Sequence, residues 1–395
     1  MILALPPDVK AIIETLQFHN HEAYIVGGCV RDSIRGTRPK DWDITTSARP
    51  CEVAAIFPRT VETGIKHGTI TVLINSRHYE VTTYRIDGEY LDNRRPESVT
   101  FATHINEDLS RRDFTINAIA YNPNKGFVDP FGGRDDISRK IIRCVGNPEE
   151  RLEEDALRML RGIRFTGQLG FSIDEATFKA ISATASNLAN ISAERIREEL
   201  TRLLCSSHME ALKLLETTGL LPYILCGHMY SGSIDKTIPL LTACPNNETL
   251  RLAIFFAWSG NASEEILRSL RFDNKTIKEV TMYTRMIHTN ILHSRYEIKK
   301  VLRQMPHGWF ENLLLLQSLF YPKEAERLAA IRREAQDIQA KGECYTLADM
   351  SIKGEDLIAV GTPPGKAIGD KLEELLDAVM REPGLNETLF EHISK

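Results

Sequence analysis

The chain has 395 residues, 42% of them hydrophobic and 26% charged, and a formal net charge of −5 at pH 7. This length exceeds what one hydrophobic core normally holds, so we expect two to four domains. The seven cysteines are scattered and form no CxxC pair, which argues against a disulfide framework and a zinc site and indicates reduced thiols. We find no signal peptide and no apolar run long enough to span a bilayer, so we expect a cytoplasmic protein without membrane contact. The acidic excess lies in residues 331–395, so the neutral remainder leaves RNA binding open.

The first forty residues predict a helix, a strand and a glycine turn, in that order. Residues 7–18 indicate a helix, and residues 23–26 indicate a short buried strand. Gly27 and Gly28 follow, and their missing side chains allow the backbone to approach a ligand closely. Residues 30–35 are compatible with a short helix after this turn.

Residues 41–45 predict a second strand that carries two acidic side chains. Side chains alternate along a strand, so Asp41 and Asp43 would share one face and Trp42 would lie on the other. Two carboxylates beside a Gly–Gly turn suit magnesium-dependent phosphoryl transfer, in which carboxylate oxygens hold the metal while backbone amides and Arg31 hold phosphates. The alternative interpretation is a turn with two solvated surface aspartates.

A β-hairpin with a third acidic residue is predicted next. Residues 68–74 and 78–85 are rich in β-branched side chains and flank a short turn. Glu80, on the second strand, could complete a metal site or act as the base for an attacking hydroxyl, or it could be an ordinary exposed glutamate. Residues 87–100 then predict a polar loop close to the site.

Two adjacent arginines and an aspartate form the next motif. Arg112 could hold triphosphate oxygens in a bidentate fork, with Asp113 beside it. The alternative is a charged helix start, and Arg111 could equally be solvated or face RNA.

Beyond residue 147 helical patterns dominate. Asn147 predicts a helix N-cap, with Glu150 at the capping-box position, and we expect one helix from there through Arg164. At about 100° per residue, one face of this helix is apolar, and the charged residues on the remaining half are Asp155, Arg158, Arg161 and Arg164. Residues 191–200 predict a further capped helix, which is either purely structural or braces the preceding one. Solvated charges on an amphipathic helix are the alternative to a binding function.

Taken together, these motifs resemble the signature of the bacterial class II CCA-adding tRNA nucleotidyltransferases, in the polymerase-β-type superfamily. The resemblance is carried by the glycine turn with Arg31, the Asp41-x-Asp43 pair, and later motifs at residues 110–118, 129–135, 154–158 and 191–200. It implies an α+β fold in which an N-terminal mixed-sheet nucleotidyltransferase head is followed by an elongated all-helical neck, body and tail. The implied boundaries are 1–146 for the head, 147–205 for the neck, 206–330 for the body and 331–395 for the tail.

The resemblance also implies roles for individual residues. Asp41, Asp43 and Glu80 would be catalytic, with Asp41 and Asp43 holding Mg²⁺. The implied nucleotide-binding residues are Gly28, Arg31, Arg112, Asp113, Asp155, Arg158, Arg161 and Arg164. Asp155 and Arg158 would form hydrogen bonds with the pairing edges of CTP and ATP, since a carboxylate acceptor beside a guanidinium donor can match both bases.

The implied activity is template-independent addition of C, C and A to tRNA that lacks part or all of its 3′ CCA, from CTP and ATP, with release of pyrophosphate. The implied mechanism is two-metal nucleotidyl transfer, with two magnesium ions held by Asp41 and Asp43 and with protein side chains that select the base. An enzyme that adds the terminal A alone remains open. A bacterial poly(A) polymerase usually has a basic Gly-Arg-rich strand where residues 63–68 read TGIKHG, and a CC-only enzyme usually lacks the loop at residues 87–100. A non-catalytic RNA-binding protein would not need Asp41, Asp43 and Arg112. The oligomeric state is left open.

Overall fold

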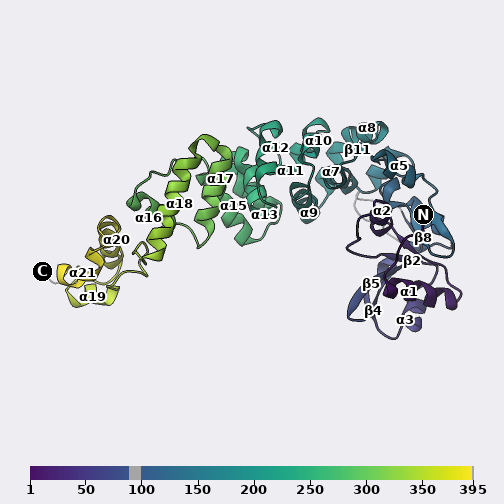
Figure 1. Cartoon of the computed structure of the whole chain (residues 1–395), viewed down its shortest axis with the longest axis horizontal. Helices are drawn as coiled ribbons and strands as arrows, with labels where there is room; N and C mark the ends of the chain where they lie inside the picture. Colours follow the sequence, from purple (N-terminus) through teal and green to yellow (C-terminus); the bar gives the residue numbers. More distant parts are fainter. Residues whose placement is uncertain (89–98, 394–395) are drawn as a thin grey trace. The chain divides into compact units, whose positions relative to one another are not determined.

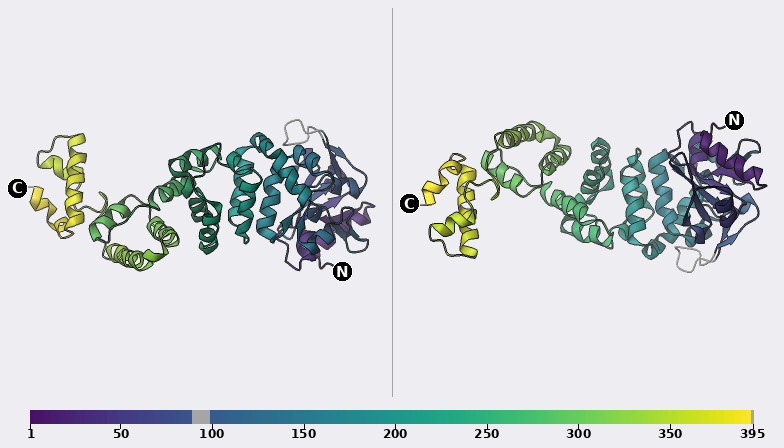
Figure 2. Two further views of the ribbon diagram at one scale, coloured as in Figure 1. Left: turned by 90° about the horizontal axis from the view of Figure 1, so that it is seen from above. Right: turned by 90° about the horizontal axis from the view of Figure 1, so that it is seen from below.

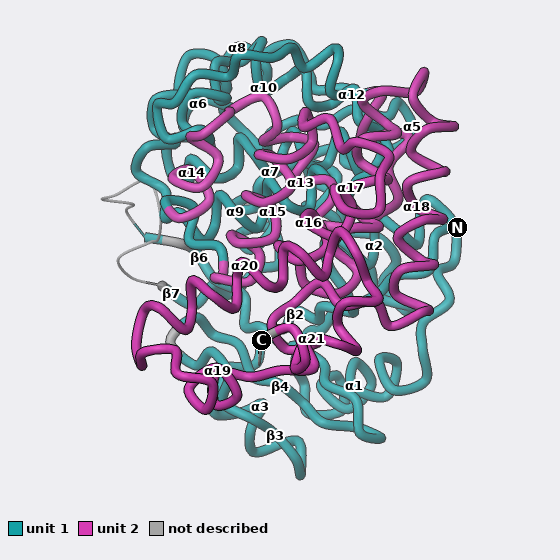
Figure 3. Tube along the Cα trace, turned by 90° about the vertical axis from the view of Figure 1, so that its left-hand side faces the viewer, with its two compact units in different colours: residues 1–238, 269–272 teal, residues 239–268, 273–395 magenta. Residues whose placement is uncertain are grey.

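The structure, a computed structural model, describes residues 1–88 and 99–393. Most of the loop predicted at residues 87–100 therefore lies outside the described residues. The chain divides into two compact units (Figure 3), of which unit 1 contains residues 1–238 and 269–272 and unit 2 contains residues 239–268 and 273–395. The finer division into head, neck, body and tail stays a prediction.

Unit 1 contains a mixed sheet of seven strands in its described part, in the order β3-β4-β5-β2-β1-β8-β9. Strands β2, β4, β5 and β8 of this sheet are labelled in Figure 1. The β2–β5 pair is parallel and the other neighbouring pairs are antiparallel, which confirms the predicted mixed sheet. The strands are β1 (Ala23–Val26), β2 (Ile44–Thr46), β3 (Thr60–Gly64), β4 (Thr69–Ile74), β5 (Arg77–Thr83), β8 (Ala120–Asn122) and β9 (Gly126–Val128). Every residue of β1 and β2 is buried, so these strands form the centre of the sheet.

The predicted hairpin is confirmed as the antiparallel pair β4–β5. Its turn residues, Asn75 and Ser76, both have positive φ values, of 50° and 61°. Two consecutive left-handed residues give the backbone twist that a tight two-residue hairpin needs. The turn places Glu80 on β5 directly opposite Thr71 of β4.

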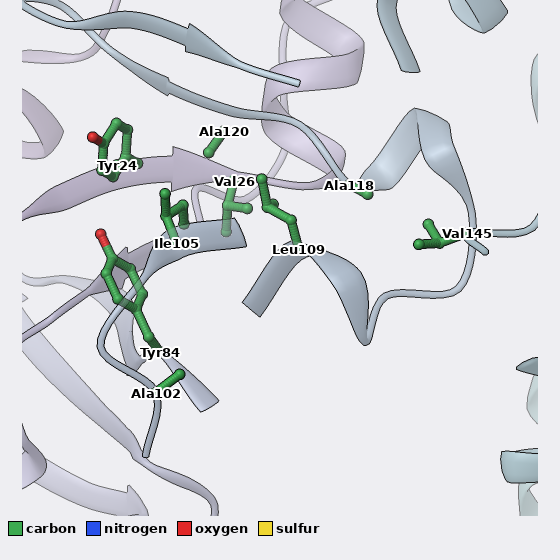
Figure 4. Packing of buried hydrophobic residues seen from close by; sticks show 9 residues of the cluster. All are labelled: Tyr24, Val26, Tyr84, Ala102, Ile105, Leu109, Ala118, Ala120 and Val145. Carbon is green, nitrogen blue, oxygen red and sulfur yellow. The ribbon is translucent and has the colours of Figure 1, made fainter. Parts of the chain in front are cut away.

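The core of the head joins the central strands to the helix ahead of the Arg-Arg-Asp motif. Figure 4 shows this cluster, whose members are Tyr24, Val26, Tyr84, Ala102, Ile105, Leu109, Ala118, Ala120 and Val145. Ile105 and Leu109 belong to helix α4 (Ile105–Ser110), whereas Tyr24 and Val26 belong to β1. Burying these apolar side chains together holds the end of α4 beside the end of β1, where the glycine turn begins.

Two further strand pairs are short. Strand β6 (Arg85–Asp87) pairs with β7 (Val99–Phe101), and the residues between them are the ones outside the described part. Strand β10 (Ile141–Ile142) pairs in parallel with β11 (Ser172–Ile173), so one strand lies within the segment for which the sequence predicts helices. This pairing ties residues on both sides of position 147 together.

The helices of unit 1 largely follow the sequence pattern. Helix α1 covers Pro7–Phe18, as predicted. Helix α2 (Gly28–Ile34) begins two residues before the predicted start. The remaining helices of this unit are α3 (Pro50–Ile56), α5 (Gly133–Arg139), α6 (Pro148–Glu154), α7 (Leu157–Leu169), α8 (Glu175–Thr184), α9 (Ala193–Leu204), α10 (Lys213–Thr217) and α11 (Leu221–Ile224), with α12 (Ile234–Ala243) crossing into unit 2.

Unit 2 is helical throughout its described residues (Figure 2). Its helices are α13 (Glu248–Phe256), α14 (Ser263–Ser269), α15 (Asn274–Met286), α16 (Arg295–Arg303), α17 (Trp309–Phe320), α18 (Ala325–Ala340), α19 (Gly354–Ala359), α20 (Lys366–Arg381) and α21 (Leu385–Ile393). A fully buried lysine, Lys299, connects three of these segments, because its Nζ lies 2.8 Å from Glu343 and 3.3 Å from the carbonyl of Met380. Among the described residues, none of the helices combines the length and apolar character needed to cross a bilayer.

Candidate active site

The two aspartates lie just ahead of β2 instead of on it. The strand begins at Ile44, three residues after the predicted start at Asp41. The carbonyl of Asp43 accepts a hydrogen bond of 3.0 Å from the amide of Val26, which holds this residue beside β1. Among the described residues, Asp41 and Trp42 form no backbone hydrogen bond to a neighbouring strand. The predicted strand was therefore wrong for residues 41–43, because β2 begins only at Ile44.

Glu80 lies next to the aspartates on the neighbouring strand. Ile44 pairs with Val81 in parallel register, so the residues immediately before them, Asp43 and Glu80, are also neighbours. Desolvation raises the pKa of Asp43 above its usual value, Arg112 opposes this shift, and Glu80 and Asp41 add to it. The carboxylates of Asp41 and Glu80 and the guanidinium of Arg112 therefore lie close enough to Asp43 to interact with it electrostatically.

The acidic side chains suit a divalent cation. Asp41, Asp43 and Glu80 all line an open groove of about 1660 Å³. Carboxylate oxygens are hard ligands, and a cation would stabilise the ionised form of Asp43, whose pKa is raised mainly by desolvation and further by Glu80 and Asp41. No cluster of three or more His, Cys, Asp or Glu residues in the described part is close enough to enclose a metal by itself.

Gly27 is the glycine that the turn requires. Its φ and ψ are 78° and −128°, and a Cβ there would lie only 3.0 Å from Nη1 of Arg112. At Gly28 a Cβ would keep 3.7 Å from Nη2 of Arg31, which is ordinary contact. The turn therefore brings Arg112 against the backbone at Gly27, whereas the sequence interpretation singled out Gly28 for nucleotide binding.

Arg31 is placed inside the head, with its guanidinium fully engaged by protein groups. Its Nε and Nη2 donate to Asp32 at 2.9 and 3.0 Å, and its Nη1 donates to Oδ1 of Asn117 at 2.7 Å. The side chain is buried and lies over the ring of Phe165. These contacts tie α2 to the segment after the Arg-Arg-Asp motif, and the predicted contact of Arg31 with phosphates remains a prediction.

A buried aspartate orients both arginines of the Arg-Arg-Asp motif. Asp108 is completely buried, and its carboxylate accepts hydrogen bonds from Arg111 at 2.7 and 3.1 Å and from Arg112 at 3.1 Å. Burial alone would raise the pKa of Asp108, but the charges of Arg112 and Arg111 hold it below its usual value. Asp108 was not among the predicted site residues, although its spacing of three and four residues before the arginines is the helical signal for such a pair.

Asp113 connects the sheet domain to the helices that follow. One oxygen accepts from the amide of Phe114 and from Asn117, and the other accepts from Nε and Nη2 of Arg161 at 2.9 and 2.7 Å. Burial opposes ionisation of Asp113, yet the Arg161 charge and these hydrogen bonds hold its pKa well below the usual value. Asp113 is therefore a permanently charged link between the motif and α7.

The predicted continuous helix from residue 147 is wrong, because it breaks at Asp155. Helix α6 ends at Glu154, Asp155 is extended with φ −144° and ψ 99°, and α7 begins at Leu157. Asn147 does cap α6 as predicted, accepting from the amide of Glu149 at 3.1 Å. Side-chain contacts explain the break, since Oδ1 of Asp155 accepts from the amide of Leu157 at 3.2 Å and takes the place of helical backbone bonds.

Asp155 and Arg158 are each held by a different partner. Both carboxylate oxygens of Asp155 accept from Arg195 of α9, at 3.1 and 2.8 Å. The buried guanidinium of Arg158 donates to Glu154, to the carbonyl of Arg151 at 2.7 Å and to the carbonyl of Arg111 at 3.2 Å. Arg195 was not predicted as a site residue, although it lies in the motif at residues 191–200. The cap predicted at Ser192 makes no side-chain hydrogen bond.

Arg161 and Arg164 converge on one buried acid, Glu199. Glu199 of α9 is paired closely with Nε of Arg164 and lies 3.8 Å from Nη1 of Arg161. Arg164 also donates to Gln168 at 2.5 Å and lies over the ring of Phe165. The structure thus brings the predicted arginines together with Asp113, through an acid on α9 that sequence reasoning did not select.

The arrangement defines the class of protein. A mixed sheet presents three carboxylates beside a glycine turn and joins, through Asp113, a helical segment rich in paired arginines. This is the construction of a nucleotidyltransferase head.

Comparisons with known proteins give the family. Residues 23–143 match a family model described as the poly A polymerase head domain, residues 170–229 match an RNA and SrmB-binding site of polymerase A, and residues 245–389 match domain 2 of tRNA nucleotidyltransferase. The CCA-adding enzyme of Geobacillus thermodenitrificans is 39% identical over 389 residues, covering 95% of this chain and 92% of that protein. The CCA-adding enzyme of Lactiplantibacillus plantarum is 37% identical over 96% of this chain and 93% of its own length.

A solved structure is similar to this chain over nearly its whole length. The crystal structure of the Bacillus stearothermophilus CCA-adding enzyme in complex with CTP has a TM-score of 0.78 and 33% identity, and the match covers 95% of this chain and 94% of that one. The chain therefore belongs to the CCA-adding enzyme family of tRNA nucleotidyltransferases. Members of this family use divalent metal ions, for which Asp41 and Asp43 of the groove provide carboxylate ligands.

Proposed function

We propose that this protein adds C, C and A to the 3′ end of tRNA from CTP and ATP and releases pyrophosphate. The observation that carries the proposal is 39% identity to a CCA-adding enzyme over 95% of the chain, with the acidic groove intact. The relative that was crystallised with CTP supports CTP as a substrate. A cytoplasmic location, where tRNA is processed, remains part of this proposal.

For the chemistry, we assign Asp41 and Asp43 to a Mg²⁺ site and Glu80 to the attacking hydroxyl. The 3′ oxygen of the RNA forms a bond to the α-phosphorus, the bond from that phosphorus to the bridging oxygen of pyrophosphate breaks, and Glu80 accepts the hydroxyl proton. Mg²⁺, when bound, stabilises negative charge on the reacting phosphate oxygens. The parallel register of Ile44 with Val81 supports a joint role, because it makes Asp43 and Glu80 neighbours.

For nucleotide choice, we assign Asp155 and Arg158 to the base edge. Arg112 and Asp113 would contact the ribose, and the remaining contacts to phosphate or base would come from Gly28, Arg31, Arg161 and Arg164. Arg195 donates one hydrogen bond to each oxygen of Asp155, and each oxygen keeps a further acceptor site for the base. The same carboxylate can accept from the N4 amino group of cytosine or the N6 amino group of adenine.

A primer-extension experiment tests the proposal. Three tRNA transcripts, ending before CCA, after C and after CC, are each offered labelled CTP or ATP, and the product lengths are read. We expect addition of two, one and no C from CTP, and addition of A to the transcript ending in CC. Addition of A alone would identify an A-adding enzyme, and long A tails would identify a poly(A) polymerase. No extension of any transcript would overturn the proposal.

A further inference from the structure

The groove that contains the catalytic acids extends away from the residues assigned to the nucleotide. Its wall includes Asp41, Asp43 and Glu80. Among the described residues that line it, none belongs to the set assigned to nucleotide binding: Gly28, Arg31, Arg112, Asp113, Asp155, Arg158, Arg161 and Arg164. A large open space therefore adjoins the acids on a side where the nucleotide is not expected.

Helix α2 runs from the glycine turn to the wall of the groove. Its first residue, Gly28, belongs to the glycine turn near Arg112, whereas Ser33, in its last turn, and Gly36, two residues after its end, line the groove. Seven helical residues extend for about 10 Å, so the glycine turn and the groove end of α2 lie about that far apart.

Reaction geometry decides which substrate occupies the groove. In phosphoryl transfer the attacking and leaving oxygens lie on opposite sides of the phosphorus. If the triphosphate lies at the glycine turn and Arg31, the attacking 3′-hydroxyl arrives from the opposite side, which is the side of the groove. The groove is then the place for the last nucleotides of the RNA.

The wall of the groove carries charge suited to RNA phosphates. Arg38 and Lys40 both line it and are exposed, and neither has an ion-pair partner among the described residues. Ile2, which is 91% exposed, and the half-buried Trp42 add an apolar part to the same wall. Unpaired cations that follow a backbone, together with an apolar surface for bases, are the features by which proteins bind single-stranded nucleic acid.

We propose that residues 36–40 and the N-terminal segment form the subsite for the single-stranded 3′ end of the RNA substrate, with Arg38 and Lys40 on its phosphates and Ile2 against its terminal base. The inference rests on the proposed function, since it names where the second substrate of the same reaction lies. Arg38 and Lys40 bind and position the RNA and take no part in the chemistry.

The test uses the full chain with Arg38 and Lys40 both changed to Ala. The matched control is Arg59→Ala, because Arg59 is also exposed in the head but does not line the groove. Initial rates are measured with a tRNA transcript ending in CC while ATP is saturating, and with ATP varied while the RNA is saturating. We expect a KM for RNA raised roughly tenfold, an unchanged KM for ATP, and wild-type values in the control.

Salt dependence provides a second readout that a folding defect does not reproduce. Each phosphate contact on a single strand contributes about 0.7 to the slope of log affinity against log salt, so two contacts contribute about 1.4. The ratio of variant to wild-type KM for RNA should therefore shrink by about sevenfold between 50 and 200 mM salt. Ile2→Ser should raise the KM for RNA without changing this slope.

The outcomes separate this inference from the proposed function. If the wild-type enzyme extends tRNA as expected, the proposed function is supported regardless of the results with the variants. An unchanged KM for RNA in the double variant overturns the subsite, and so does a raised KM for ATP alone, which would assign Arg38 and Lys40 to the triphosphate. A melting temperature equal to that of the wild type excludes misfolding of the double variant.

Discussion

Arg195 holds both carboxylate oxygens of Asp155, at 3.1 and 2.8 Å, from a helix 40 residues further along the chain. The two side chains are only 28% and 15% exposed, so the pair is largely shielded from solvent. A bidentate guanidinium–carboxylate pair fixes the orientation of both groups. Asp155 lies in the break between α6 and α7, outside both helices, and Arg195 positions its two oxygens together with the amide of Leu157.

We predict that Arg195→Ala relaxes nucleotide choice. Without Arg195 the carboxylate of Asp155 can rotate, and an acceptor that is no longer fixed discriminates less between bases. The ratio of kcat/KM for CTP and ATP to that for UTP and GTP should fall by roughly tenfold, the effect of about 1.4 kcal/mol. The same ratio for Arg195→Lys should lie between those of the wild type and Arg195→Ala, because lysine keeps the charge but loses the planar guanidinium.

The control for this prediction is Arg202→Ala, which removes an exposed arginine from the same helix. Its nucleotide discrimination should match that of the wild type. Equal losses of kcat/KM for all four nucleotides in Arg195→Ala would mean that Arg195 only stabilises the fold.

Replacing Asp155 or Arg158 with Ala should have a larger effect on the same ratio. An unmatched buried polar group costs about 1–3 kcal/mol, so discrimination against UTP and GTP should fall by roughly tenfold or more. The measurement is incorporation of each nucleotide, offered singly, onto a transcript lacking CCA. A uniform loss of rate would assign both residues to the structure of the α6–α7 junction.

Asp41→Ala and Asp43→Ala should each abolish addition of both C and A, while tRNA binding stays close to wild type. The carboxylates are assigned to the metal and not to the RNA. Product gels report the activity, and filter binding with labelled tRNA reports the affinity. Asp135→Ala, an exposed aspartate elsewhere in the head, serves as the control. Substantial turnover in both single variants would be incompatible with the metal site proposed.

Asp113→Asn should destabilise the protein by about 3 kcal/mol at pH 7, because it removes the buried carboxylate that Arg161 binds at 2.9 and 2.7 Å and leaves only the more distant Glu199, at 3.8 Å, as its counter-charge. The pKa of Asp113 is lowered in the folded protein from its usual 3.8, so its contribution is complete above that value and is lost as the pH falls toward the folded pKa. The difference in urea midpoint between wild type and variant should therefore narrow below about pH 4.

Glu175→Gln is the control for the pH experiment, because it removes an exposed acid that pairs only with Lys179 on the surface. Its urea midpoint should follow that of the wild type at every pH. A difference between wild type and Asp113→Asn that stays constant down to pH 2.5 would show that Asp113 acts through hydrogen bonding alone.

Deleting residues 88–96 should leave C addition nearly intact and block the terminal A. The sequence places a polar loop there, between elements of the head, and the same pocket has to accept first cytosine and then the larger adenine. Product lengths from transcripts ending before CCA and after CC measure the two steps separately. Equal loss of C and A addition in a deletion variant that still melts cooperatively would contradict this role.

Local patterns along the chain predicted most of the fold. The helix at Pro7–Phe18, strand β1 and the β4–β5 hairpin occur where β-branched runs and helical periodicity indicated them. The predictions that were wrong concern the strand expected at Asp41, which begins only at Ile44, and the helix expected through Asp155, which has a distant partner in Arg195. Helical periodicity assumes a continuous axis, so it did not reveal that the chain leaves the helix at Asp155 to meet Arg195.

The sequence alone determined the order of the elements, the acidic pair after a glycine turn and the resemblance to a tRNA nucleotidyltransferase, because each of these depends on residues close together in the chain. The tertiary structure decided the partners of the charged side chains. Arg161 pairs with Asp113 across 48 residues, and Arg31 pairs with Asn117 across 86. A buried charge is stable only beside its counter-charge or hydrogen-bond partner, and which residue provides it depends on how the elements pack.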